Sequence, residues 1–332
     1  MRVQLVHTYD DIISRHNLLD AWREFLKGKR NRKDVQEFQY RLSDNILTLH
    51  RDLAARTYTH GGYEHFKVND PKPRDIHKAS VRDRLLHHAL YRQLYPFFDK
   101  TFIHDSYSCR HLKGTHKAMN RFREFSRIVS KNDTRTAWVL KCDIRKFFAS
   151  IDQQVLMDIL RAYIPDHDIL TLLNRVIESF SSTEKGKGLP LGNLTSQLLV
   201  NIYMNEFDQF VKHQLKAKHY IRYADDFVFL SDDRDVLAKL LPQAQSFLQT
   251  KLKLELHPDK VSLGTLVSGI DFLGWVHFPH HRVLRTSTKK RMLRNLQGEP
   301  SEATVASYQG MLGWGNAQRL SKLIPKTKTT LA

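Results

Sequence analysis

Residues 220–231 read Tyr-Ile-Arg-Tyr-Ala-Asp-Asp-Phe-Val-Phe-Leu-Ser and carry the strongest structural signal in the chain. Aromatic and β-branched residues flank a short acidic break, a pattern typical of two strands joined by a tight turn. We expect Ala224, Asp225 and Asp226 to form the tip of this hairpin. Adjacent carboxylates repel each other, and a cation such as Mg²⁺, which prefers carboxylate oxygen, offsets that repulsion. For the dipeptide alone, a solvated turn remains the alternative to a metal site.

A second acidic element lies at residues 138–152, Trp-Val-Leu-Lys-Cys-Asp-Ile-Arg-Lys-Phe-Phe-Ala-Ser-Ile-Asp. Its apolar residues predict a strand that ends at Asp143, and the chain then turns into a helix for which Asp152 is a suitable N-cap. An aspartate at the end of a strand is commonly a cap or a turn former. Together with the acidic hairpin, however, Asp143 completes a carboxylate set of the kind that holds two metals ~3.5–4 Å apart.

Composition indicates a folded protein with a polyanionic partner. Hydrophobic residues make up 41% and aromatic residues 10% of the 332-residue chain, which argues against disorder. The formal net charge is +18, and basic residues recur along the whole chain, as expected for an extended nucleic-acid track. A ribosome-like scaffold and binding to an anionic membrane surface remain alternatives on composition alone.

The cysteines and the apolar runs predict a cytoplasmic protein without a membrane partner. Cys109 and Cys142 are the only cysteines and lack metal-ligand spacing, so we expect reduced, structural thiols, with a single disulfide as the alternative. The first residues become acidic too early for a signal peptide. No apolar run approaches the ~20 residues that span a bilayer, and the 18 histidines show no zinc spacing.

The remaining chain predicts mostly helices. Apolar residues recur at helical spacing in residues 9–57, 80–98, 115–125, 194–211 and 236–254. Residues 61–76 predict two strands around a proline-rich turn, and residues 269–276 predict another hairpin. We expect residues 282–332 to be basic and helical. The basic break at residues 27–33 fits either an RNA contact or a solvated loop.

Several of these motifs resemble those of reverse transcriptases. Tyr-Ala-Asp-Asp between aromatic strands resembles their catalytic hairpin, residues 102–110 resemble the second block of bacterial retroelement polymerases, and residues 269–276 resemble the last palm block. The resemblance covers about residues 35–325. It implies an α+β right-hand polymerase with fingers, a palm built on an antiparallel sheet, and a short helical thumb. The implied domains are an N-terminal helical extension (1–60), fingers (61–134), palm (135–282, with 155–187 packing toward the fingers) and thumb (283–332).

The resemblance also implies roles for individual residues. Two Mg²⁺ ions, or Mn²⁺ as a substitute, would be held at Asp143, Ile144, Asp225 and Asp226. Lys260 would be a general acid for the leaving pyrophosphate, although a plain surface lysine is the alternative. Contacts to the incoming dNTP would come from Lys67, Lys72, Arg74, Phe148, Leu191 and Gly192. Contacts to the RNA/DNA hybrid would come from Arg285, Lys289, Lys290, Arg291 and Arg294.

Two of these assignments have structural alternatives. An aromatic at the position of Phe148 would lie under the sugar and exclude a 2′-hydroxyl, so the product would be DNA. Phe148 could instead be a core residue beside Phe147. The basic run that begins at Arg285 could be a solvated face rather than a nucleic-acid contact.

Residues 191–197, Leu-Gly-Asn-Leu-Thr-Ser-Gln, point to one subfamily. General retroelement enzymes tend to have Gln where Leu191 stands and Ser-Pro where Ser196 and Gln197 stand. The block here resembles reverse transcriptases of diversity-generating retroelements, which are bacterial or phage-encoded. That implies mutagenised cDNA made from a template-repeat RNA, adenine mutagenesis, and a small basic accessory protein. The alternatives are a retron, group II intron-like or phage-defence reverse transcriptase, or a non-catalytic RNA-binding scaffold.

Overall fold

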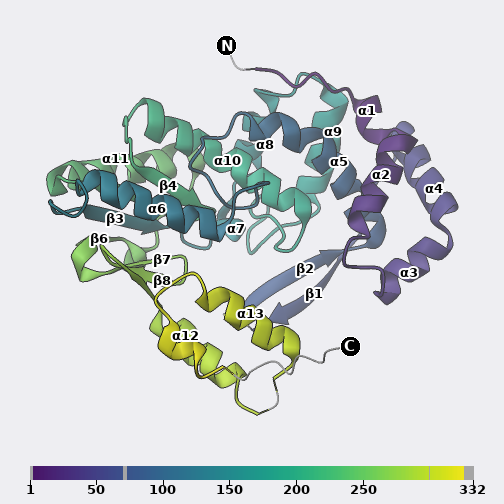
Figure 1. Ribbon diagram of the computed structural model, residues 1–332. Coiled ribbons are helices and arrows are strands. Elements are labelled where there is room, and N and C mark those ends of the chain that lie inside the picture. Colours follow the sequence, from purple (N-terminus) through teal and green to yellow (C-terminus); the bar gives the residue numbers. More distant parts are fainter. Residues whose placement is uncertain (1–2, 70–72, 299, 325–332) are drawn as a thin grey trace. The chain divides into compact units, whose positions relative to one another are not determined.

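The computed structural model describes residues 3–69, 73–298 and 300–324 (Figure 1). The chain forms two compact units, each assembled from three separate stretches. Unit 1 comprises Met1–His104, Ile144–Lys216 and Ala244–Leu256, and unit 2 comprises the stretches between and after them.

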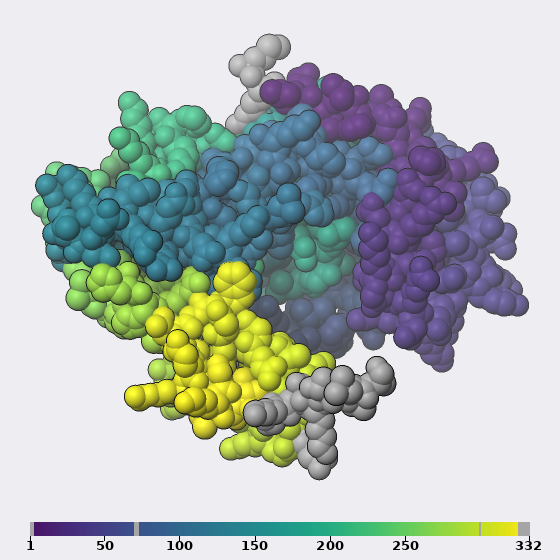
Figure 2. All heavy atoms as spheres, in the orientation of Figure 1, coloured from purple at the N-terminus to yellow at the C-terminus, as the bar shows by residue number. Residues whose placement is uncertain are grey.

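The N-terminal part of unit 1 is helical, which confirms the prediction for residues 9–57. Its helices are α1 (Tyr9–Ile13), α2 (Arg15–Phe25), α3 (Lys33–Tyr40) and α4 (Leu42–Ala54), coloured purple in Figure 2. The long helix α5 (Val81–Asp99) packs against α2. Ser80 caps α5 by accepting a hydrogen bond from the backbone of Asp83 at 3.1 Å. The buried Asn17 side chain donates to the Ala89 carbonyl at 3.1 Å and so joins the two helices.

The rest of unit 1 consists of one hairpin and further helices. Strands β1 (Tyr63–Val68) and β2 (Arg74–Ala79) form a two-stranded antiparallel sheet, as predicted. The helices are α7 (Phe147–Ser150), α8 (Gln153–Arg161), α9 (His167–Glu178) and α10 (Leu194–His213). Asp152 caps α8, since its Oδ1 accepts from the Val155 amide at 2.9 Å. Helix α10 packs against α5 and α8 and places the residues before its first turn beside β2.

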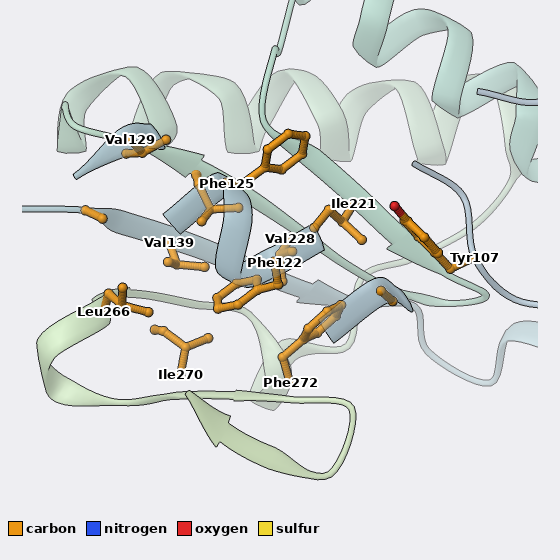
Figure 3. Close-up of a cluster of buried hydrophobic side chains, with 13 residues drawn as sticks. Tyr107, Phe122, Phe125, Val129, Val139, Ile221, Val228, Leu266, Ile270 and Phe272 are labelled. Atoms are coloured by element: carbon orange, nitrogen blue, oxygen red, sulfur yellow. The ribbon is translucent and has the colours of Figure 1, made fainter. Parts of the chain in front are cut away.

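Unit 2 is built on a four-stranded antiparallel sheet in the order β4-β5-β3-β6. The strands are β3 (Trp138–Asp143), β4 (Tyr220–Tyr223), β5 (Asp226–Ser231) and β6 (Ser262–Thr265). Helix α6 (Thr115–Val129) packs on β4 and β5. Its apolar face, with Phe122 and Phe125, meets Val139, Ile221 and Val228 of the sheet in one buried cluster (Figure 3). This cluster fixes the strands that carry the predicted carboxylates.

A second core in unit 2 joins a three-stranded sheet to the C-terminal helices. The sheet contains β7 (Ile270–Phe272), β8 (Trp275–His277) and β9 (Arg282–Leu284), and the helices are α12 (Thr286–Asn295), α13 (Glu302–Leu312) and α14 (Gln318–Ser321). Trp275, Leu284 and Met292 are buried together. The expectation that the chain is helical from residue 282 onward is therefore wrong for β9, because these residues pair with β8 before the first basic helix begins.

The remaining elements are helix α11 (Arg234–Leu252) and two short 3₁₀ turns, η1 (Pro258–Lys260) and η2 (Leu266–Ser268). Both cysteines are free thiols, but only Cys142 is buried, so the expected structural role does not extend to the exposed Cys109. Across the described residues, none of the helices has the length and apolar character required to cross a bilayer.

Candidate active site

Two of the predicted carboxylates face each other in the sheet of unit 2. Asp143 is the last residue of β3, and its direct partner on β5 is Asp226. Residues paired in this way have Cβ atoms only ~4.5–5.5 Å apart, and like charges there destabilise the ladder. Asp226 is the first residue of β5 rather than part of the turn, because it pairs with Tyr223 and closes the β4–β5 hairpin. The two-residue tip is therefore Ala224 and Asp225.

The tip of this hairpin is held by a buried arginine. Ala224 has φ +55°, a left-handed conformation that is costly for a residue with a side chain. The side chain of Arg222 is fully buried, donates from Nη1 to the Ala224 carbonyl at 3.1 Å, and donates from Nη2 to Ser106 Oγ at 3.1 Å. Arg222 was not among the predicted site residues. A charged side chain inside an otherwise apolar strand was the available signal, since arginine is almost never fully buried without a specific role.

The carboxylate of Asp226 is largely buried and incompletely hydrogen-bonded. Its Oδ1 is buried and has no hydrogen-bond partner. Burial, and also the nearby charges of Asp143 and Asp225, raise the pKa of Asp226 to about 7, although Lys141 and Arg285 act in the opposite direction. Lys141 Nζ lies 3.7 Å from Asp226 Oδ2 and donates to the Asp271 carbonyl at 2.7 Å. The positive charge available in unit 2 therefore offsets only part of the carboxylate repulsion.

Lys260 lies directly beside Asp143. Its Nζ is 2.7 Å from Asp143 Oδ1, and its side chain is 41% exposed. The backbone supports this pairing, because the His257 amide donates to the Asp143 carbonyl at 2.8 Å just before η1. Asp143 and Lys260, which were predicted as site residues from separate motifs, are thus adjacent in the structure.

The carboxylates are suitable ligands for a divalent cation, although they do not form a complete metal site. Within the part of the chain that the structure describes, no three His, Cys, Asp or Glu side chains form a ready metal cluster. A cation would nevertheless supply the partner that Asp226 Oδ1 lacks and would offset the repulsion that raises its pKa. The Ile144 side chain is buried, and its backbone forms an isolated bridge with Leu256.

Several predicted nucleotide contacts cluster in unit 1 beside β2. The His77 amide donates to the Leu191 carbonyl at 3.1 Å, and Asn193 Nδ2 donates to the His77 carbonyl at 3.1 Å. Gly192 has φ +104°, and a Cβ there would lie 3.1 Å from Ile76 Cγ2. The positive φ therefore favours glycine, and the close approach of β2 leaves little room for a Cβ.

Phe148 joins the same cluster through the backbone, because its carbonyl accepts from the Leu189 amide at 2.8 Å. Phe147 is buried, whereas Phe148 is only partly buried. Phe147 is therefore the core residue of this pair, whereas part of the Phe148 side chain is accessible to solvent. Arg74 and Lys67 are exposed on the β1–β2 hairpin, and Lys72 lies outside the described residues.

The predicted nucleic-acid contacts are placed on or just before α12. Lys289, Lys290 and Arg294 are exposed, and Arg291 is partly buried. Arg285 differs from the others, because its Nε donates to Asp271 Oδ1 at 2.7 Å and its amide donates to the Gly274 carbonyl. Its guanidinium is thus engaged within unit 2.

Comparisons with solved structures show the fold. The chain is similar to apo telomerase from Candida tropicalis, with a TM-score of 0.50 and 14% identity, over 69% of this chain and 55% of that one. It is also similar to telomerase from Candida albicans, with a TM-score of 0.51 and 11% identity, over 77% and 53% of the two chains. The predicted α+β right-hand polymerase fold is confirmed.

Sequence comparisons show the family. The chain is 26% identical to Protein YkfC of Escherichia coli (strain K12) over 79% of this chain and 75% of that protein. It is 23% identical to the group II intron-encoded protein LtrA of Lactococcus lactis subsp. cremoris over 68% of this chain, and the match spans 47% of LtrA, about half its length. The family profile described as reverse transcriptase (RNA-dependent DNA polymerase) matches residues 67–277. The predicted enzyme class, an RNA-directed DNA polymerase, is confirmed, and the chain belongs to the reverse transcriptase family.

Proposed function

We propose that this protein copies RNA into DNA with divalent metal ions held by Asp143, Asp225 and Asp226. The observation that carries the proposal is the direct pairing of Asp143 with Asp226, whose buried Oδ1 has no partner. Carboxylates from two separate strands are what a two-metal site requires, and Mg²⁺ prefers such oxygen ligands. When bound, the two ions would supply charge stabilisation for the attacking and the leaving oxygen of nucleotidyl transfer.

The chain's own residues would position the reactants and move one proton. Arg222 fixes the turn that presents Asp225, through its bond to the Ala224 carbonyl. Lys260 Nζ lies at Asp143, and from there it would donate a proton to the departing phosphate as a general acid. Release of Lys260 from its ion pair with Asp143 would free its side chain for this role.

The cluster beside β2 would bind the incoming deoxynucleotide. The accessible part of Phe148 would lie against the sugar, which would exclude a 2′-hydroxyl. Gly192 would allow close approach to the nucleotide, and Leu191 would contact the nascent base pair without offering a hydrogen bond. The exposed Lys67 and Arg74 would offset the charge of the triphosphate.

We further propose that the protein is the error-prone enzyme of a diversity-generating retroelement. The support is the sequence of residues 191–197, in which an aliphatic residue replaces the usual amide. Discrimination between correct and incorrect pairs depends on contacts that report their geometry, so loss of a polar contact lowers fidelity. The template would be a template-repeat RNA, the product a mutagenised cDNA with changes at adenines, and the partner a small basic accessory protein. The enzyme would act in the cytoplasm of a bacterium or in a phage-infected cell.

A group II intron-like enzyme is the second candidate. It is favoured by the similarity to the group II intron-encoded protein LtrA. Such an enzyme would copy its template without errors concentrated at adenines, so the error spectrum separates the two candidates.

The test is primer extension on an RNA template that contains all four bases, with Mg²⁺ and dNTPs, followed by sequencing of the cDNA. Leu191→Gln should reduce the errors at template adenines, whereas Leu191→Met, which has similar length but no amide, should keep them. Evenly distributed errors in the unmodified protein would favour the group II intron-like enzyme. An adenine-rich error spectrum that is the same in all three proteins would refute the role of Leu191.

A further inference from the structure

Unit 2 contains a cavity that shares no residue with the proposed polymerase site. Its volume is about 290 Å³, just below the usual range for small-ligand sites. It lies between α6, the β8–β9 turn and the segment after α13, and we call it the α6–β9 cavity. Its walls include Phe122, Arg123, His277, Phe278, Arg282 and Trp314. None of the residues that line it is acidic.

Two arginines, Arg123 and Arg282, bring positive charge to the α6–β9 cavity. Arg282 donates from Nε to the Trp314 carbonyl and from Nη2 to Asn120, but its Nη1 is buried without a hydrogen-bond partner. Burial and the neighbouring charge of Arg123 lower the pKa of the Arg282 guanidinium. A buried guanidinium nitrogen without a partner is costly, and an anion that accepts from Nη1 would remove that cost.

Aromatic rings line the same cavity. Phe278 stacks on His281, with ring centroids 4.8 Å apart and 12° between the planes. Trp314 stacks on His116, with centroids 3.9 Å apart and planes at 18°, although 37% of the tryptophan remains exposed. Flat rings beside guanidinium groups are the combination that binds the bases and phosphates of unpaired nucleotides.

We propose that the α6–β9 cavity binds one nucleotide of a single-stranded nucleic acid, with its phosphate at Arg123 and Arg282 and its base against Phe278 or Trp314. A duplex would not fit, because its bases are stacked on one another and unavailable to the protein rings. The cavity would therefore hold an unpaired part of a strand. This role is additional to polymerisation, and it can be measured as binding when no nucleotide is incorporated.

The experiment uses the full chain and a single-stranded RNA of about 12 nucleotides, within the usual length bound by one such surface. The RNA carries one photoreactive 4-thiouridine and a fluorescent label, and a DNA strand and an RNA/DNA hybrid of the same sequence are tested in parallel. Crosslinks are mapped by mass spectrometry, and affinity is measured by fluorescence anisotropy at fixed salt. Thermal unfolding checks that each variant is folded.

The variants distinguish binding at the α6–β9 cavity from nonspecific electrostatic attraction of the strand. Arg123→Gln removes an exposed cation of the cavity, and Arg127→Gln removes an exposed cation one turn further along α6 that does not line it. Trp314→Leu removes the exposed ring. We expect Arg123→Gln and Trp314→Leu each to weaken single-strand binding about fivefold or more, in line with the loss of one phosphate or base contact, and Arg127→Gln to have less than half that effect.

Crosslinks at Phe278, His281 or Trp314 that are lost in Arg123→Gln would support the proposal. Equal weakening by Arg123→Gln and Arg127→Gln would overturn it, because binding would then follow net charge alone. Competition by free UMP as strong as that by the strand, at equal nucleotide concentration, would also overturn it in favour of a free-nucleotide site. Preference for RNA over DNA would identify which kind of strand is bound.

Discussion

Asp143 and Asp226 are direct partners on the antiparallel strands β3 and β5, so two carboxylates face each other across one rung of the sheet. The surrounding core is apolar, the Asp226 side chain is largely buried, and one of its oxygens has no partner. Such a pair lowers the stability of the fold, and under the proposed function a cation would relieve that cost.

Asp226→Asn should therefore stabilise the metal-free protein. The pKa of Asp226 is raised to about 7 by burial and by neighbouring carboxylates, so the stability that this group contributes is present below its unfolded pKa of about 4 and is lost as pH rises through about 7. At about pH 8 with a chelator, the variant should gain on the order of 1–3 kcal/mol in urea unfolding. Asp271→Asn, which breaks the ion pair with Arg285, should instead lose stability. A loss in both variants would contradict the account.

Arg222→Lys should loosen the β4–β5 hairpin. Lysine cannot reproduce the two guanidinium bonds to the Ala224 carbonyl and Ser106 Oγ, so a buried site is left with unsatisfied groups. We expect a loss of about 2–4 kcal/mol in urea unfolding and a lower kcat in primer extension below the transition temperature. The exposed Arg234→Lys should change stability by less than about 0.5 kcal/mol. Equal, small effects at both arginines would show that Arg222 does not support the turn.

Gly192→Ala should impair nucleotide binding more than Gly186→Ala. Both glycines have positive φ, +104° and +77°, so both variants bear a backbone cost of about 1–2 kcal/mol. Only at Gly192 does the new Cβ meet a neighbour, Ile76 Cγ2 at 3.1 Å, whereas the space at Gly186 is open. The KM for dNTP should therefore rise in Gly192→Ala and stay near its original value in Gly186→Ala. A similar rise in both would mean that backbone strain alone, and not the contact with β2, sets the KM.

The sequence predicted the strands and helices around the site because these depend on local periodicity. The apolar run before Asp143 and the aromatic residues on both sides of Asp225 were sufficient for β3, β4 and β5. The direct pairing of β3 with β5 and β6 could not be predicted in this way, because it joins segments far apart in the chain. The placement of Asp226 in a strand rather than at the turn follows from that pairing.

Other features depended on packing that no local pattern reports. Arg222 lies in a strand whose other residues are apolar, and its two hydrogen bonds become apparent only when Ser106 lies beside it. Strand β9 consists of three residues next to a basic helix, so its composition resembled the helix more than a strand. The α6–β9 cavity likewise forms from four segments that are separate in sequence.

The protein should lose stability in mild acid because of buried histidines. Burial lowers the pKa of His277 to about 4, and burial likewise lowers the pKa of His87 to about 3. Each histidine binds fewer protons in the folded state than in the unfolded state. The free energy of unfolding therefore has its full value above about pH 6.5 and falls as the pH drops toward 4, by at most ~1.4 kcal/mol per pH unit for each histidine. His277→Gln should reduce this slope, whereas the exposed His16→Gln should leave it unchanged in urea unfolding at several pH values. An unchanged slope in His277→Gln would contradict the burial argument.

Mg²⁺-dependent primer extension on an RNA template, with the original protein, Asp225→Asn and Asp235→Asn, tests whether the β4–β5 hairpin is catalytic. Asp235 is an exposed aspartate at the start of α11 and serves as the control for loss of one negative charge. The account predicts DNA product from the original protein and from Asp235→Asn, and a loss of at least about a hundredfold in Asp225→Asn, as for removal of other preorganised electrostatic groups. Unchanged nucleotide incorporation by Asp225→Asn would contradict the assignment of this hairpin as the catalytic site.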